Sequence, residues 1–325
     1  MSTKTSHSTH QAGIFAHIPK NARYLRYTRA ADATKSDLRT ILQALADLVD
    51  GEQVVLGLGP TLLKDLQPSK AAAIAGLHDF TAPAGSKVAW PHSPADLWLW
   101  LRAAPGQDAG HLHALTQQLH SVVQPAFALL DAVDAFRHMA QGDEDAGISR
   151  DLTGFQDGTE NPKGRKALAA AFAVDGSSFV AVQHWQHRWA RIHGMSTHDQ
   201  SLAMGRDRAS NEEIEDAPES AHIKRTTQED FTLSDGSEGF SWRRSMPWVG
   251  GDASGLHFVS FGKSFEAFEL QLARMSGVDK VSPDGITDAV LQMSQPLRTS
   301  YYWCPPMHAS KQGVGSQKRL DLSFL

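Results

Sequence analysis

Apolar positions recur at two different spacings along the chain, and they predict helices that alternate with strands. A helical spacing follows a capping residue, Ser36, and runs through Leu38, Ile41, Leu42, Leu45, Leu48 and Val49. A second helix is predicted from about His111. Short apolar runs bounded by glycine or polar residues predict buried strands at 53–59 and 95–103.

The second half of the chain repeats this succession. The predicted strands are 177–185, 240–248, 255–262 and 300–306. A helical pattern lies between the last two of these strands and runs through Phe265, Phe268, Leu270, Leu272 and Met275. The order of elements indicates an α+β fold with two halves of similar size, although no internal repeat is visible residue by residue. Consecutive short strands favour antiparallel sheets over a doubly wound parallel sheet.

A segment rich in Gly, Asp and Glu, residues 137–165, separates the two halves. We therefore expect a first half at 1–150, a second half at 151–312 and a flexible tail at 313–325. The tail is rich in Gly, Ser and Lys and ends in the apolar letters "LSFL".

Composition and charge exclude several classes of protein. The 325 residues are 41% hydrophobic and 21% charged, which is typical of a globular protein. A net charge of -5 without a basic run argues against nucleic acid as a partner. No apolar run reaches the ~18 residues of a membrane span, and the start "MSTKTSHSTHQAG" has no apolar signal region. One cysteine, Cys304, excludes a disulfide framework and an iron–sulfur cluster. We expect a soluble, cytoplasmic protein with no membrane partner.

The segment "DLTGFQDGTENPKG", residues 151–164, has neither helical nor strand periodicity and is predicted to be a loop. It places Gly154, Gly158 and Gly164 around one carboxylate, Asp157. By itself, Asp-Gly is typical of a turn in which the side chain bonds to the backbone.

The string "GFQDGTENP" closely resembles the signature loop of the dye-decolourising peroxidases, a family of haem enzymes. Further strings resemble the bacterial cytoplasmic branch of that family in the expected order: "FVAVQHWQHRW", "MSTHDQSLAMGRDRASNEEIEDAPESAHIKRT", "RRSMPWVG" and "DGITDAVLQMSQPLRTSYYWCPP". The resemblance implies two ferredoxin-like halves, each with an antiparallel sheet and packed helices, and haem b (heme b, iron protoporphyrin IX) in the second half. It also implies reduction of hydrogen peroxide through a ferryl intermediate, with oxidation of dyes, phenols or other small organic reductants.

On the proximal side, the resemblance assigns the axial iron ligand to His222 in "SAHIKRT". A carboxylate that accepts the other ring hydrogen makes an imidazole a stronger ligand. The family commonly carries this acid at the position of Asp288, and Asp284 is the competing candidate. The alternative for Asp288 is an exposed acid in the first turn of a helix.

On the distal side, the resemblance makes Asp157 the group that takes the peroxide proton and returns it to the departing oxygen. An ordinary carboxyl pKa of roughly 4 leaves it ionised near neutrality. Neighbouring glycines let the backbone approach a flat porphyrin where a Cβ would collide. Gly158 and Thr159 are expected to make backbone contacts beside Asp157.

The distal cation is expected to be Arg243, which stabilises the leaving hydroxide. In a strand over 240–248, Arg243 and Ser245 face one way and Arg244 the other. The family pattern of arginine, one variable residue, then Ser or Asn before a hydrophobic-Pro pair fits the same register. Ser245 is then an auxiliary hydrogen-bonding residue.

Two further assignments leave alternatives open. Arg206 in "AMGRDR" is a partner for a haem propionate or else a surface ion pair. Phe258 and Phe261 cannot share one face of a regular strand, so at most one of them packs over the ring.

Two other classes of function compete with the peroxidase. One is a haem-binding or iron-handling protein with incidental peroxidase activity, and the other is a scaffold protein without haem. The resemblance implies a homo-oligomer, a dimer or larger. Some family members are cargo of an encapsulin shell through a carboxy-terminal tail, but the tail "GVGSQKRLDLSFL" matches the usual cargo sequence poorly.

Overall fold

The structure is a computed structural model that describes residues 10–140, 143, 148–279, 284–309, 318–323 and 325. The expectations for the amino-terminal segment 1–9 and for residues 313–317 of the tail lie outside these ranges.

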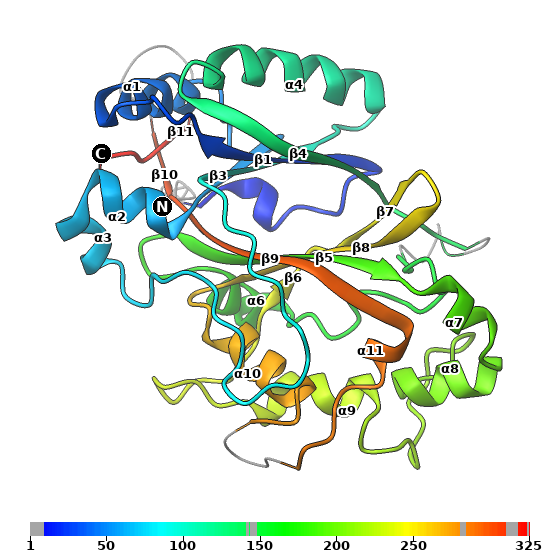
Figure 1. Cartoon of the computed structure of the whole chain (residues 1–325). Helices are drawn as coiled ribbons and strands as arrows, with labels where there is room; N and C mark the ends of the chain where they lie inside the picture. The colour runs from blue at the N-terminus through cyan, green and yellow to red at the C-terminus, as the bar shows by residue number, and fades with distance from the viewer. Residues whose placement is uncertain (1–9, 141–142, 144–147, 280–283, 310–317, 324) are drawn as a thin grey trace, which may run out of the picture.

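The first half contributes four strands and the helices that cover them. The strand order across the sheet is β2-β3-β1-β4, with bounds β1 Asn21–Arg29, β2 Val54–Leu58, β3 Leu97–Arg102 and β4 Phe127–Phe136. The helices are α1 Lys35–Ala46, α2 Pro60–Leu66, α3 Pro68–Ala73 and α4 Ala109–Val123, after a short 3-10 turn at Ala12–Ile14. Helices α1 and α4 lie together over one side of the sheet (Figure 1).

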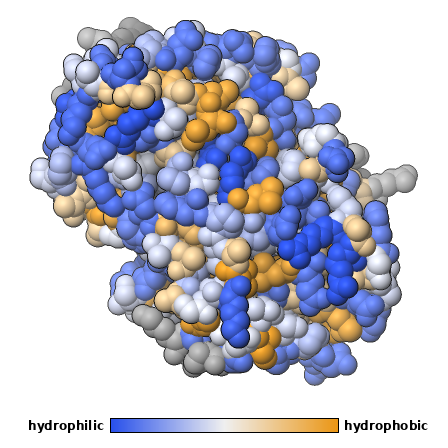
Figure 2. Space-filling view, viewed as in Figure 1, coloured by the Kyte–Doolittle hydropathy of each residue, from blue (hydrophilic) through white to orange (hydrophobic). Residues whose placement is uncertain are grey.

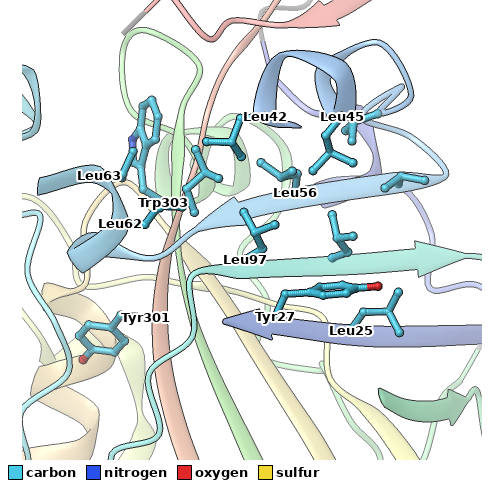
Figure 3. Close-up of a cluster of buried hydrophobic side chains, with 14 of the residues drawn as sticks. Leu25, Tyr27, Leu42, Leu45, Leu56, Leu62, Leu63, Leu97, Tyr301 and Trp303 are labelled. Atoms are coloured by element: carbon cyan, nitrogen blue, oxygen red, sulfur yellow. The ribbon is translucent and has the colours of Figure 1, made fainter. Parts of the chain in front are cut away.

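Helix α1 shows how the sequence sets this layer. It is capped by Thr34, whose Oγ1 accepts a hydrogen bond from Asp37 N, so the predicted cap at Ser36 is wrong by two residues. Its buried leucines pack on the outward side chains of the sheet, and this apolar cluster is drawn in Figure 3. The cluster includes Leu25, Tyr27, Leu42, Leu45, Leu56 and Leu97.

The second half follows the same plan of strands with helices on one side. Its strands are β5 Ser178–His187, β6 Trp242–Arg243, β7 Met246–Gly250, β8 Ala253–Gly262 and β9 Ser294–Cys304. Its helices are α6 Gly164–Ala171, α7 Trp189–His193, α8 Thr197–Met204, α9 His222–Thr226, α10 Glu266–Met275 and α11 Val290–Met293, with a 3-10 turn at Gln228–Asp230. These helices lie across the sheet from α1 and α4 (Figure 1).

The two halves share one sheet, where the sequence led us to expect a separate sheet in each half. Nine strands are joined in the order β5-β9-β2-β3-β1-β4-β7-β8-β6, and a further pairing of β5 with β8 closes them into a barrel-like sheet. The pairings between these strands are antiparallel, as expected. The halves meet at two narrow seams, at the pairs Leu58 with Trp303 and Ala135 with Trp248.

Side chains alternate between the inside of this barrel and its outer faces. The inside holds a second apolar cluster with large aromatic side chains, among them Tyr24, Trp98, Trp100 and Tyr302. The outer surface seen in Figure 2 is mostly hydrophilic, with apolar patches between the polar residues. None of the helices in the described part of the chain has the length and apolar character that a membrane span requires.

The predicted strand at 240–248 is interrupted in the structure. Strand β6 ends at Arg243 and β7 begins at Met246. Between them, Arg244 N donates to Val259 O at 2.8 Å, and Val259 N donates to Ser245 Oγ at 3.4 Å. A serine hydroxyl therefore replaces a backbone acceptor at the break.

The end of the chain packs against the first half, which differs from the expected flexible tail. Strand β11, Lys318–Leu320, pairs with β10, Met307–Ala309. Leu320 and Leu322 are buried, and Gln67 Nε2 donates to Leu325 O at 2.6 Å. Leu320 and Leu322 are therefore part of the core, and Leu325 packs against it.

Candidate active site

A cavity lies between the outer face of the second half's sheet and the helices that cover it. It encloses about 1190 Å³ of space, its open mouth included. Strands β5 and β8 form one wall, helices α9 and α10 face them, and residues 151–160 close one end. Strand β8 and helix α10 contribute apolar side chains to the lining: Leu256, Phe258, Phe268, Leu272 and Met275.

Strand periodicity explains which side chains reach this cavity. Gln183, Trp185 and His187 alternate along β5 and all line it. On β8, Phe258 lines the cavity, whereas Phe261 lies in the cluster inside the barrel. Phe258 and Phe261 therefore lie on different faces of β8, as their spacing predicted.

His222 is the first residue of α9 and lines the cavity. Its Nδ1 donates to Asp288 Oδ2 at 2.7 Å, and the Asp288 side chain is completely buried. Asp288 Oδ1 accepts from Val290 N at 2.8 Å, which fixes the carboxylate. Asp284 pairs instead with Arg225. Of the two candidate acids only Asp288 contacts His222, and the imidazole keeps its Nε2 for the cavity.

A glycine allows α8 and α9 to approach each other behind His222. Gly205 ends α8 with a φ of 88°, and a Cβ at this position would lie 2.2 Å from Ile223 Cγ2. Any larger residue must therefore displace Ile223, the neighbour of His222.

We expect Gly205→Ala to destabilise the fold by about 1–3 kcal/mol, because it adds a clash to the strain of a left-handed backbone. Chemical denaturation measures this change. Gly236→Ala is the matched control, since Gly236 has a φ of 81° but open space where its Cβ would stand. Equal losses in the two variants would contradict the close contact at Ile223.

The loop 151–164 brings Asp157 to the cavity. Asp157 N donates to Ser149 O at 2.9 Å, and Gly158 follows with a φ of 79°. Burial raises the pKa of Asp157, while the nearby Arg243 guanidinium lowers it, and the net direction is upward. This differs from the ordinary value expected from the sequence, because the carboxyl is withdrawn from water. Gly158 and Thr159 also line the cavity.

The raised pKa of Asp157 makes a prediction about stability and pH. A carboxyl whose pKa is higher in the folded protein has no effect below the ordinary pKa of about 4, and it destabilises the fold increasingly as pH rises through the folded value. In haem-free protein, Asp157→Asn should raise the melting temperature at pH 7, and the gain should vanish near pH 4. Asp252→Asn, in an exposed turn, is the control. A wild-type protein more stable than Asp157→Asn at pH 7 would contradict the assignment.

Arg243 reaches the cavity from β6, and Asn161 holds its backbone. Arg243 N donates to Asn161 Oδ1 at 2.8 Å, and Asn161 Nδ2 donates to Arg243 O at 3.1 Å. These two bonds join the Asp157 loop to the strand that carries the cation. Burial lowers the pKa of Arg243 and Asp157 raises it. Asn161 is a positioning residue that the sequence interpretation missed, although it belongs to the quoted string "GFQDGTENP".

Arg244 and Ser245, the next two residues along the chain, do not line the cavity. Arg244 lies over the Trp242 ring at 3.9 Å, and its guanidinium donates to Ile14 O and Phe15 O. Ser245 is buried and is not among the residues that line the cavity. Among the described residues the cavity therefore receives Arg243 but neither Arg244 nor Ser245.

Arg206 lines the cavity and is also paired with two carboxylates. Its Nη2 lies 2.7 Å from both Glu160 Oε1 and Glu213 Oε1. The ion pair, one of the two alternatives left by the sequence, is therefore present, and the propionate role of Arg206 stays a prediction.

Comparisons with known proteins found a family model and curated relatives that match much of this chain. The family model described as "Dyp-type peroxidase, C-terminal" matches residues 148–309. A dye-decolorizing peroxidase from Brevibacterium linens is 30% identical over 241 residues, which cover 71% of this chain and 61% of that protein. The chain therefore spans less than two thirds of this curated relative.

Solved structures resemble the whole fold. A putative Dyp-type peroxidase from Shewanella oneidensis has a TM-score of 0.77 at 25% identity and covers 93% of this chain and 97% of its own. A DypB variant from Rhodococcus jostii in complex with heme has a TM-score of 0.71 at 24% identity, covering 88% and 93%. The encapsulated DyP-type peroxidase from Mycobacterium smegmatis has a TM-score of 0.71 at 23% identity, covering 92% and 96%. Through residues 148–309, this chain belongs to the dye-decolourising peroxidase family.

Proposed function

We propose that this protein is a haem peroxidase of the dye-decolourising type, which reduces hydrogen peroxide and oxidises small organic reductants. The observation that carries the proposal is one cavity lined by His222, which Asp288 holds, and by the acid–cation pair Asp157 and Arg243. A histidine oriented by a carboxylate suits a metal, and an acid beside an arginine suits proton transfer to a developing anion.

The lining fits a flat, largely apolar group with polar edges. Three buried nitrogens of the cavity have no hydrogen-bond partner among the described residues: Arg243 Nε, His187 Nε2 and Gln271 Nε2. Buried polar atoms are rarely left unpaired, so these atoms support a missing occupant. No cluster of three metal-binding side chains occurs in the described part of the chain, so an iron held by His222 alone needs a porphyrin for its other ligands.

Haem b would be held by His222 Nε2 at the iron, with Phe258 and the backbone at Gly158 and Thr159 against the ring. Arg206 stands at the cavity where it can meet a propionate. When bound, the haem supplies the two electrons that cleave the peroxide O–O bond.

The chain's own groups handle the proton and the charge. Asp157 accepts the proton of peroxide and returns it to the departing oxygen. Arg243 stabilises the negative charge that develops on that oxygen. Asp288 holds the hydrogen on His222 Nδ1, so the lone pair of the imidazole stays on Nε2. We assign Ser245 an auxiliary role through its bond to Val259 N, which sets the break before β7.

We further infer that each half, 1–150 and 151–312, is ferredoxin-like. The order β2-β3-β1-β4 and the order β7-β8-β5-β9 support this, because each places the half's first strand between its third and fourth. A cytoplasmic location is also proposed, which suits a single, buried, unpaired cysteine. A homo-oligomer and enclosure in an encapsulin shell remain proposals that rest on the family and on the encapsulated relative.

The test is the absorption spectrum of the purified protein loaded with haem, before and after one equivalent of hydrogen peroxide. We expect a Soret band that changes rapidly with peroxide and returns when a dye or phenol is added. A Soret band that does not respond to peroxide would favour a haem-binding protein, and an absent band would contradict both.

A further inference from the structure

The cavity contains a second carboxylate, Asp151, that the proposed mechanism does not use. It stands at the start of a short hairpin that also carries Asp157. Arg150 and Gln156 form an antiparallel bridge, Asp151 N donates to Phe155 O at 2.9 Å, and Asp157 N donates to Ser149 O at 2.9 Å. In such a ladder Asp151 and Asp157 lie on the same face as diagonal neighbours, about 7–8 Å apart.

The Asp151 carboxylate accepts hydrogen bonds from the residues of the hairpin turn. Its Oδ1 accepts from Thr153 N at 3.0 Å and from Phe155 N at 3.1 Å, and Thr153 Oγ1 lies 2.7 Å from both carboxylate oxygens. Among the described residues no lysine, arginine or histidine forms an ion pair with it. Burial raises the pKa of Asp151, and the hydrogen bonds that its carboxyl accepts from Thr153 and Phe155 lower it, with a net upward direction. Above that pKa, the charge of Asp151 is stabilised by dipoles but not cancelled by a cation.

We propose that Asp151 is a positioning residue for Asp157: its carboxylate holds the turn that places Asp157, and its negative charge on the same hairpin face makes Asp157 a stronger base. The role rests on the proposed function, since a stronger base matters only if Asp157 accepts a proton there.

Some surroundings of Asp157 raise its pKa and others lower it. Arg243, Arg244 and the Gly158 N–H lower the pKa of Asp157, whereas burial and Asp151 raise it. Glu160, Arg206 and His222 line the same cavity. Burial is the largest of these causes, and the Asp151 carboxylate adds to it against the two arginines.

The test is Asp151→Asn. The amide keeps an oxygen that can accept from Thr153 N and Phe155 N, so the turn is retained while the charge is lost. We expect the acid limb of the rate of reaction with peroxide to move down by about 1 pH unit, because one negative charge at this distance is removed. Thr153→Val is the matched control, because it removes the hydroxyl bond and keeps both charges. An unchanged acid limb in Asp151→Asn, or an equal shift in Thr153→Val, would overturn the proposal.

A second readout does not depend on haem or on activity. The carboxyl band of Asp157 is followed with pH by infrared spectroscopy of haem-free protein, as the difference from Asp157→Asn, with and without Asp151→Asn. A lower titration midpoint when Asp151 is replaced supports the role even if peroxide turnover fails, and equal midpoints would refute it. Hydrogen exchange of the amides of Thr153 and Phe155 reports whether the turn has persisted.

Discussion

Replacing His222 by alanine is expected to remove the Soret band, or to shift it and lower haem affinity by at least about 100-fold. The reason is that, among the described residues that line the cavity, His222 is the histidine whose ring is oriented by a buried carboxylate through Nδ1, which leaves Nε2 to bind iron. Since loss of a supporting carboxylate alone typically costs 10–100-fold in metal affinity, loss of the ligand itself should cost more. Haem titration and the absorption spectrum measure the change.

His187→Ala is the matched control, because His187 lines the same cavity but bonds through Nδ1 to Ser294 Oγ at 2.7 Å. It should keep a Soret band, shifted at most slightly, because one buried nitrogen beside the haem is lost but the iron ligand is retained. Added imidazole should restore the band in His222→Ala by filling the space left by the side chain. A normal spectrum and haem content in His222→Ala would exclude it as the ligand.

Replacing Arg243 by leucine is expected to slow the reaction with peroxide by about 10²–10³-fold, the loss typical when one group that stabilises a developing anion is removed. Stopped-flow mixing of haem-loaded protein with peroxide measures this rate. Arg244→Leu is the control from the next position. It should unfold at a lower temperature, because its bonds to Ile14 O and Phe15 O and its contact with Trp242 are lost, yet react at nearly the wild-type rate. Equal losses of rate in the two variants would contradict the opposite directions of these side chains.

Much of the fold was predictable from local pattern, and the exceptions have physical reasons. The buried strands β2, β3, β5 and β8 are apolar runs, so their sequences are distinctive. Strand β4 was missed because half of its residues are exposed and its apolar positions do not alternate. Strand β1 was missed because it carries charge into the barrel, where Arg26 pairs with Asp131 at 2.6 Å. Arg26 and Asp131 lie on different strands, so the sequence of either strand alone does not reveal the ion pair.

The candidate site was predictable only in part. Asp157, His222 and Arg243 were assigned by resemblance, and the structure brings all three to one cavity. Ser245 was assigned from a continuous strand, but the strand is broken just before it. The role of Asn161 depends on a contact across 82 positions of sequence, and no local pattern encodes it.

The two seams that close the barrel are related to each other. Within each half the strands can be counted from first to fourth, with β6 set aside as an added edge strand. At one seam β4, the fourth strand of the first half, pairs with β7, the second strand of the other half. At the other seam β2, the second strand of the first half, pairs with β9, the fourth strand of the other half. The order of strands at the two seams is therefore the same when the two halves are exchanged. In the first half, α1 packs its leucines directly onto the sheet. In the second half, α10 also packs apolar side chains onto the sheet, but a cavity remains between strands β5 and β8 and helices α9 and α10. The same order of strands therefore carries a packed helical layer in one half and a cavity in the other.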